Sequence, residues 1–98
     1  RKNRSLHYDK LGRPIDMAAW CARIDDPYYR FVAQDILPGG VRISTVWLGI
    51  DRGFGRGKPV IFETMIFGGP HDGDMNRYST LEQALAGHKR MLEWATHV

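Results

Sequence analysis

The amino-acid sequence predicts a single α+β domain over residues 1–98: an antiparallel meander sheet of three to four strands, with a C-terminal amphipathic helix packed on one face and a short N-terminal helix. Two patterns predict this fold. Residues 41–50 alternate as a strand does, and residues 60–67 form a second apolar run. Residues 79–96 carry apolar side chains at helical spacing. A chain of 98 residues that is 43% apolar suits one domain with one modest core.

The N-terminal part of the chain is expected to hold a basic arm and a short helix. Residues 1–5 contain three cations and no apolar side chain, which predicts a flexible, solvated arm. Asp16 is a good N-cap for a helix that ends near Ile24, because Pro27 follows shortly afterwards. Cys21 lies in this helix and is the only cysteine, so no internal disulfide can form. A reducing compartment and a buried position are expected for it.

Three strands are expected in the middle of the chain. Residues 28–37 are rich in aromatic and branched side chains, and a Pro-Gly-Gly turn at 38–40 leads into the clearest strand, residues 41–50. The connection 51–59 is too long for a two-residue hairpin turn, and the next strand follows at 60–67. Because loops of moderate length join successive strands, an antiparallel meander is the most economical topology.

The C-terminal helix has the clearest signals, and a brief fourth strand at 76–78 is expected before it. Ser79 or Thr80 is expected to cap the helix, and Ser79 with Glu82 has the spacing of a capping box. Gly87 weakens the middle of the helix, which predicts a close approach to the sheet. The expected apolar stripe consists of Leu81, Leu85, His88, Leu92 and Ala95, widened by Ala84 and Met91.

The central strand predicts a sheet that is apolar on both faces. Ile43 and Trp47 share one face, whereas Val46, Leu48 and Ile50 share the other. The C-terminal helix can cover only one of them. The second face is therefore expected to meet the N-terminal helix, a second copy of the chain in a homodimer, or a protein partner.

Positive charge is concentrated in two segments, residues 1–13 and 41–60, of a chain whose net charge is +3. The run Gly-Phe-Gly-Arg-Gly-Lys at 53–58 is not a phosphate-binding loop, because Pro59 follows it instead of Ser or Thr and a helix. Two interpretations stay open: a flexible hairpin tip, and a contact finger whose aromatic ring stacks or inserts while its cations pair with acidic groups. The residues predicted to bind a partner are Arg52, Phe54, Arg56 and Lys58, helped by Arg1, Lys2 and Arg4.

Catalytic and metal-binding motifs are missing from the sequence, so neither a metal nor a cofactor is expected. The four histidines form no zinc-type pair, and no Gly-x-Ser-x-Gly occurs. Residues 71–74, His-Asp-Gly-Asp, are interpreted as a polar turn rather than a cation site. His88 is interpreted as a half-buried structural residue, although Glu63 would pair with it if the helix crossed that strand. No apolar run approaches the ~20 residues of a membrane span, so no membrane contact is expected.

Several blocks of the sequence resemble a run seen in small proteins of bacteriophages and prophages. The blocks are Tyr8-Asp9 with Gly12 and Pro14-Ile15, Ser44–Asp51, Phe62–Gly69, and Arg77–Thr80 with Glu82, Ala84 and His88. The resemblance covers roughly Tyr8 to Met91, and Phe62–Gly69 is its most specific part. Such proteins often carry histidine where this chain has Arg52, so no role of that histidine transfers. They have no established activity. The resemblance therefore implies a setting, an accessory protein in the cytoplasm of a host cell, and such proteins include inhibitors of CRISPR and other defence systems.

Three functional hypotheses follow. The first is a non-enzymatic phage or prophage accessory protein that binds a host protein or ribonucleoprotein, such as an anti-CRISPR-type inhibitor of a defence complex, through the residues predicted above. The second is direct binding of nucleic acid by the basic arm and the loop at 52–58. The third is a small ligand-binding protein or enzyme that uses Glu63 and His88 together with His71.

Overall fold

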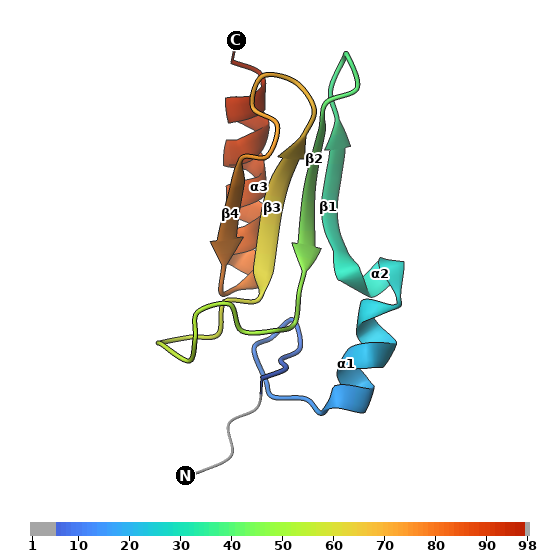
Figure 1. Ribbon diagram of the computed structural model, residues 1–98, viewed down its shortest axis with the longest axis vertical. Helices are drawn as coiled ribbons and strands as arrows, with labels where there is room; N and C mark the ends of the chain where they lie inside the picture. The colour runs from blue at the N-terminus through green and yellow to red at the C-terminus, as the bar shows by residue number, and fades with distance from the viewer. Residues whose placement is uncertain (1–5, 98) are drawn as a thin grey trace.

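The computed structural model describes residues 6–97 and confirms the α+β fold. Its elements are α1 (Met17–Ile24), α2 (Pro27–Arg30), β1 (Phe31–Ile36), β2 (Arg42–Trp47), β3 (Phe62–Phe67), β4 (Met75–Tyr78) and α3 (Leu81–Ala95). The strands form one antiparallel sheet in the order β1-β2-β3-β4, which is the predicted meander. α3 packs along one face of the sheet and lies behind the strands in Figure 1. No helix of the described chain is long and apolar enough to cross a membrane.

The two N-terminal helices extend from one end of the sheet, below β1 and β2 in Figure 1. The indole Nε1–H of Trp20 donates to the carbonyl oxygen of Leu48 over 2.9 Å. Tyr29 packs edge-on against Trp47, with the ring centroids 4.8 Å apart. Because α1 faces the sheet end through Trp20, Cys21 points outward, and the prediction that this thiol is buried is wrong.

The start of the predicted strand at 28–37 is also wrong, because its first residues belong to α2. The Asp26 carboxylate accepts from the backbone N–H of Tyr28 over 3.0 Å, which caps a new helical turn. Pro27 occupies the first helical position, where its fixed φ suits a helix and its missing N–H costs nothing. The strand therefore begins only at Phe31.

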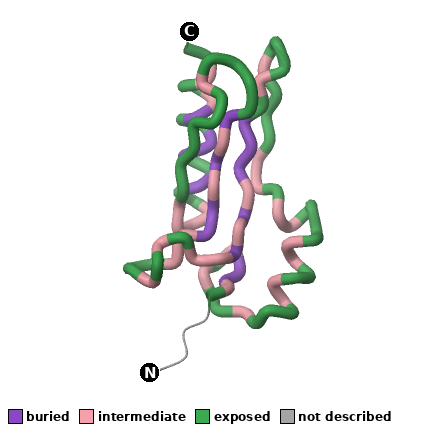
Figure 2. Tube along the Cα trace, in the orientation of Figure 1, coloured by how far each residue is buried: buried purple, intermediate pink, exposed green. Residues whose placement is uncertain are grey.

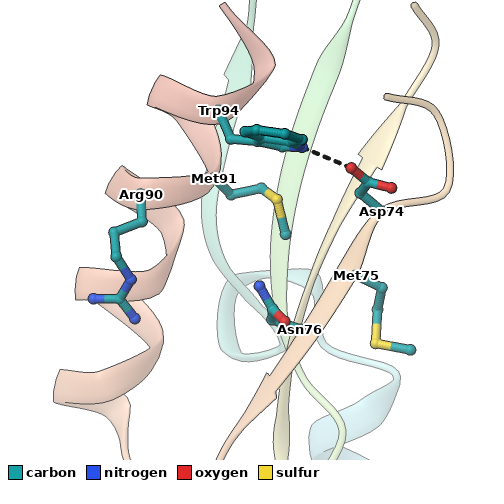
Figure 3. A pocket seen from close by; sticks show the side chains of 6 residues that line it. All are labelled: Asp74, Met75, Asn76, Arg90, Met91 and Trp94. Carbon is teal, nitrogen blue, oxygen red and sulfur yellow. Dashed lines mark hydrogen bonds between the residues drawn. The ribbon is translucent and has the colours of Figure 1, made fainter. Parts of the chain in front are cut away.

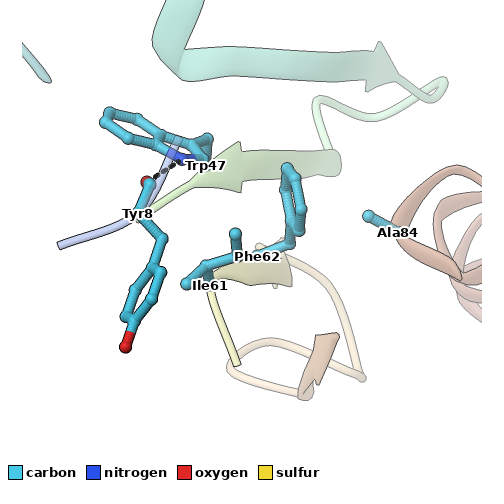
Figure 4. Close-up of a cluster of buried hydrophobic side chains, with 5 residues drawn as sticks. All are labelled: Tyr8, Trp47, Ile61, Phe62 and Ala84. Carbon is cyan, nitrogen blue, oxygen red and sulfur yellow. Dashed lines mark hydrogen bonds between the residues drawn. The ribbon is translucent and has the colours of Figure 1, made fainter. Parts of the chain in front are cut away.

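The face of the sheet under α3 is closed. The six β2 and β3 residues that point toward the helix are all buried: Ile43, Thr45, Trp47, Phe62, Thr64 and Ile66. Apolar side chains form two clusters on this side. One, drawn in Figure 4, joins Tyr8, Trp47, Ile61, Phe62 and Ala84. The other joins Ile43, Ile66 and Met91. Figure 2 shows the buried residues concentrated along β2, β3 and α3.

The cap of α3 confirms one of the two alternatives for its start. The hydroxyl oxygen of Thr80 accepts from the N–H of Gln83 over 3.0 Å, and the Gln83 side chain accepts from the N–H of Thr80 over 3.3 Å. The capping box is therefore Thr80 with Gln83, and the predicted box of Ser79 with Glu82 is wrong. Ser79 directly follows the last residue of β4, one position too early to cap a helix that begins at Leu81.

The buried side of α3 coincides with one edge of the predicted stripe, at Ala84, His88 and Met91, and not with its middle. Its buried residues are Ala84, Gly87, His88 and Met91, whereas Leu85 is 45% exposed. Gly87 lies against the ring of Tyr78 so closely that a Cβ would clash with it. This contact confirms the predicted close approach to the sheet.

The opposite face of the sheet, called here the open face, carries no other element of the described chain (Figure 1). The strand register arranges its side chains in three rows. These rows are Phe31, Val46, Glu63 and Arg77, then Gln34, Ser44, Met65 and Met75, and last Ile36, Arg42 and Phe67. The N-terminal helices do not cover this face, which removes one of the three expected coverings.

Candidate functional site

The strongest candidate site is the part of the connection between β2 and β3 that spans residues 51–60, called here the basic loop. It projects away from the sheet at the lower left of Figure 1. Asp51 organises it from within. One carboxylate oxygen accepts from the backbone N–H groups of Gly53 (2.7 Å) and Val60 (2.9 Å), and the other accepts from that of Gly55 (3.1 Å). The N–H of Arg52 also donates to the carbonyl of Val60 over 2.8 Å. The loop thus has a hydrogen-bonded base, which the flexible-tip interpretation did not anticipate.

Phe54 at the tip of the basic loop is 93% exposed and has φ of 58°. The left-handed backbone conformation costs a non-glycine residue about 1–2 kcal/mol of conformational free energy. An exposed aromatic ring also forgoes the stabilisation that burial of its apolar surface would give. Neither cost is repaid by contacts of the ring with the described chain. Residues held in such conformations concentrate at functional sites. Phe54 therefore has the properties of a contact residue.

The cationic side chains of the basic loop, Arg52, Arg56 and Lys58, are all exposed. Within residues 6–97 no hydrogen bond, ion pair or aromatic contact engages any of these three side chains. The carboxylate of Asp51 is turned toward backbone N–H groups. The loop therefore presents three cationic side chains without an ion-pair partner in the described chain beside an exposed aromatic ring.

The N-terminal segment runs past the base of the basic loop. The carbonyl of Leu6 accepts from the N–H of Asp51 over 3.2 Å, and the N–H of Tyr8 donates to the carbonyl of Gly49 over 2.8 Å. The three residues predicted to assist binding lie outside the described residues: Arg1, Lys2 and Arg4.

The turn that follows this segment has two groups with shifted pKa values. Burial alone would raise the pKa of Asp9, but hydrogen bonds from the N–H groups of Arg13 and Leu11, with the Arg13 guanidinium, hold it below its ordinary value. Burial lowers the pKa of Lys10, against the opposing charge of Asp26. Both groups serve the turn: Asp9 fixes its backbone, and the ammonium of Lys10 lies 4.5 Å from the ring centroid of Tyr29.

The interior holds a chain of side chains that resembles the order of a catalytic triad. Asp35 accepts from Nε2–H of His88 over 2.7 Å, and Nδ1 of His88 lies 2.7 Å from the hydroxyl of Thr45. Thr45 in turn lies 2.6 Å from the hydroxyl of Thr64. Because a nucleophile must reach its substrate and both hydroxyls are fully buried, this arrangement suits a structural network. It satisfies the polar groups between the two apolar clusters.

The residues of the enzyme hypothesis are not brought together. Glu63 lies on the open face, where it accepts from the Arg77 guanidinium over 3.0 Å, and His88 lies on the closed face with Asp35. His71 lies near the C-terminal end of α3, where the centroid of its ring is 4.5 Å from that of Trp94. No group of three candidate metal ligands occurs within residues 6–97.

A hollow lies between β4 and α3, with a volume of about 440 Å³ (Figure 3). The indole N–H of Trp94 donates to the carboxylate of Asp74 over 2.6 Å and closes one end. Its remaining lining residues are Met75, Asn76, Arg90 and Met91. No residue predicted to be functional lines this hollow.

Sequence reasoning named the exposed residues of the basic loop but missed Asp51. The signal was present, because an aspartate followed by glycines at the second and fourth positions is typical of a carboxylate that binds the backbone of its own turn. Comparison of the chain with family models, curated proteins and solved structures gives no match.

Proposed function

We propose that this protein is a non-enzymatic binding protein that docks onto an acidic surface of a host macromolecule through the basic loop. Together with the resemblance to phage and prophage accessory proteins, this suggests an inhibitor of a CRISPR-type or other defence complex in the host cytoplasm. The observation that carries the proposal is Phe54, an aromatic ring that is 93% exposed at a left-handed backbone position and flanked by unpaired cations.

The chemistry of the basic loop determines what it can bind. Pairing of Arg52, Arg56 and Lys58 with carboxylates or phosphates speeds association and orients the complex. Burial of the Phe54 ring in a pocket of the partner supplies apolar contact, as aromatic anchors do at interfaces. Because Asp51 holds the loop backbone, less conformational entropy is lost on binding.

The test is capture of partners from infected or lysogenic cells, with quantitative mass spectrometry, followed by titration of the captured partner. The variant Arg56→Glu/Lys58→Glu reverses two loop charges. It should lower the affinity for the partner by about tenfold or more, since two attractive pairs become repulsive. Phe54→Ala should lower it further.

The matched control is Lys89→Glu/Arg90→Glu, which reverses two exposed charges on α3 and alters the net charge equally. It should keep full affinity. Equal losses in the loop variant and in the α3 variant would show that only the net charge matters, and unchanged binding by the loop variant would remove the basic loop as the contact site.

Direct binding of nucleic acid is the second candidate, because a ring beside cations is also how proteins stack unpaired bases. A single-stranded oligonucleotide titrated at several salt concentrations separates the two. Phosphate binding should weaken steeply as salt rises and should require Phe54. Absence of binding at low salt would eliminate this candidate and leave the first intact.

A further inference from the structure

The open face of the sheet leaves an apolar surface uncovered at the centre of the molecule. Its exposed side chains include Ile36 (74% exposed), Phe67 (39%), Phe31 (37%) and Met75 (37%). The register places the half-buried Val46 and Met65 between Phe31, Met75 and Phe67, which makes these residues one patch. Arg42 separates Ile36 from it. A contiguous apolar patch on a sheet is typical of an interaction surface.

Two guanidinium groups mark opposite ends of this patch. Arg30 lies over the ring of Phe31 at 4.8 Å, in the first row, and Arg42 lies over the ring of Phe67 at 4.5 Å, in the third row. Within the described chain neither has a carboxylate partner, while the Arg30 guanidinium donates to the backbone carbonyl of Ile24 over 3.2 Å. Glu63, the acidic residue of the patch, is already paired with Arg77. The open face therefore has unmet positive charge at both ends.

A second copy of the chain fits this surface poorly. Four strands about 4.8 Å apart and rows that span about 13 Å give a face of roughly 200–400 Å². A standard interface between two globular subunits needs about 800 Å² from each partner, whereas a single helix about 10 Å wide can be accommodated on the smaller face. Two stacked copies would also oppose Arg30 and Arg42 with no free carboxylate on either side.

We propose that the open face binds an amphipathic helix with an acidic flank, which would complete a helix–sheet–helix sandwich. A helix with side chains is about 10 Å wide, so it fits along the strands. The span of about 13 Å between the outer rows equals two to three helical turns, which sets the spacing of the two carboxylates that meet Arg30 and Arg42. α3 already packs on the closed face in this way. This inference stands independently of the basic loop.

Methionine methyl groups report directly on this surface. The chain has four methionines: Met65 and Met75 lie on the open face, Met91 is buried under α3, and Met17 lies on α1. The probe is a synthetic amphipathic helix of about 18 residues with leucines on one side and glutamates along its flanks. In methyl NMR spectra of the full chain, it should shift the Met65 and Met75 signals and leave those of Met17 and Met91 in place.

Charge provides the matched controls. A peptide with lysine in place of each glutamate should bind about tenfold more weakly or worse. Arg42→Glu leaves one cation and one carboxylate at the two ends, so it should abolish the preference for the glutamate peptide. Lys89→Glu should bind the glutamate peptide as the wild-type protein does. The loop variant Arg56→Glu/Lys58→Glu should also bind it normally, so failure of the loop proposal and failure of this one are separate results.

Three outcomes would overturn the inference. The first is equal binding of the glutamate and lysine peptides. The second is shifts of Met17 or Met91 as large as those of Met65 and Met75, or no shifts at all. The third is movement of the Met65 and Met75 signals with protein concentration alone, together with dimers in sedimentation, which would make a second copy the occupant.

Discussion

At the scale of single residues, the triad-like arrangement of Asp35, His88 and Thr45 has a structural role, because it satisfies the hydrogen-bonding groups of polar side chains in the interior. His88 bridges the exposed carboxylate of Asp35 and the buried hydroxyl of Thr45, so both ring nitrogens are satisfied. Within the described chain no buried side-chain nitrogen or oxygen lacks a partner. The sequence predicted His88 as a half-buried structural residue; the structural role agrees, but the side chain is buried, at 5% exposure. The sequence could not identify Asp35, because that pairing depends on the register of β1, 53 residues away.

The two threonines of this network should not contribute equally to stability. Thr45→Val removes the partner of Nδ1 of His88 and should lower the free energy of unfolding by about 1–3 kcal/mol, since a buried polar atom is left unpaired. Thr64→Val leaves His88 bonded to Thr45 and should cost less. Urea unfolding of both variants measures the difference. An equal loss, or a larger loss in Thr64→Val, would contradict the proposed order of the hydrogen bonds.

At the scale of elements, hydrogen bonds of the capping residues set the helix boundaries, and the sequence pattern misplaced some of these boundaries by a few residues. Asp16 caps α1 as predicted, because its carboxylate accepts from the N–H of Ala19 over 2.8 Å. Asp26 caps a further turn that the aromatic content of residues 28–37 concealed. For α3, the helical period was clear, but its phase was set by the contact of Gly87 with Tyr78 on another element, which no local pattern contains.

The cap of α3 gives a matched pair of variants at adjacent positions. Thr80→Ala removes the hydroxyl that accepts from Gln83 and should destabilise the protein by about 1 kcal/mol. Ser79→Ala loses one long contact of its hydroxyl, 3.5 Å from the carbonyl of Lys58, and should cost little. Thermal or denaturant unfolding compares them. A larger effect at Ser79 would mean that the helix starts one residue earlier.

At the scale of the whole molecule, the sheet separates a closed face from an open one, and the basic loop projects from one end (Figure 1). The sequence predicted the meander, the helix over one face and an apolar surface on the other, because strand periodicity reveals both faces. It assigned that surface to Val46, Leu48 and Ile50, which is wrong for the last two, because β2 ends at Trp47. It did not reveal that the N-terminal helices stay at the end of the sheet. That placement rests on long-range contacts such as Trp20 with Leu48.

The candidate site could be predicted in its residues but not in its shape. Glycines and cations at 52–58 indicate an exposed loop, whereas the conformation that lifts Phe54 into solvent depends on three backbone N–H groups converging on the Asp51 carboxylate. This convergence is what distinguishes a prepared contact surface from a mobile tip.

Amide hydrogen exchange in the free protein tests this claim most directly. The amides of Gly53, Gly55 and Val60 should exchange more slowly than unprotected amides, and Asp51→Asn should speed their exchange while β2 and β3 stay protected. Exchange of these three amides at unprotected rates in the wild-type protein would contradict a basic loop held ready for binding.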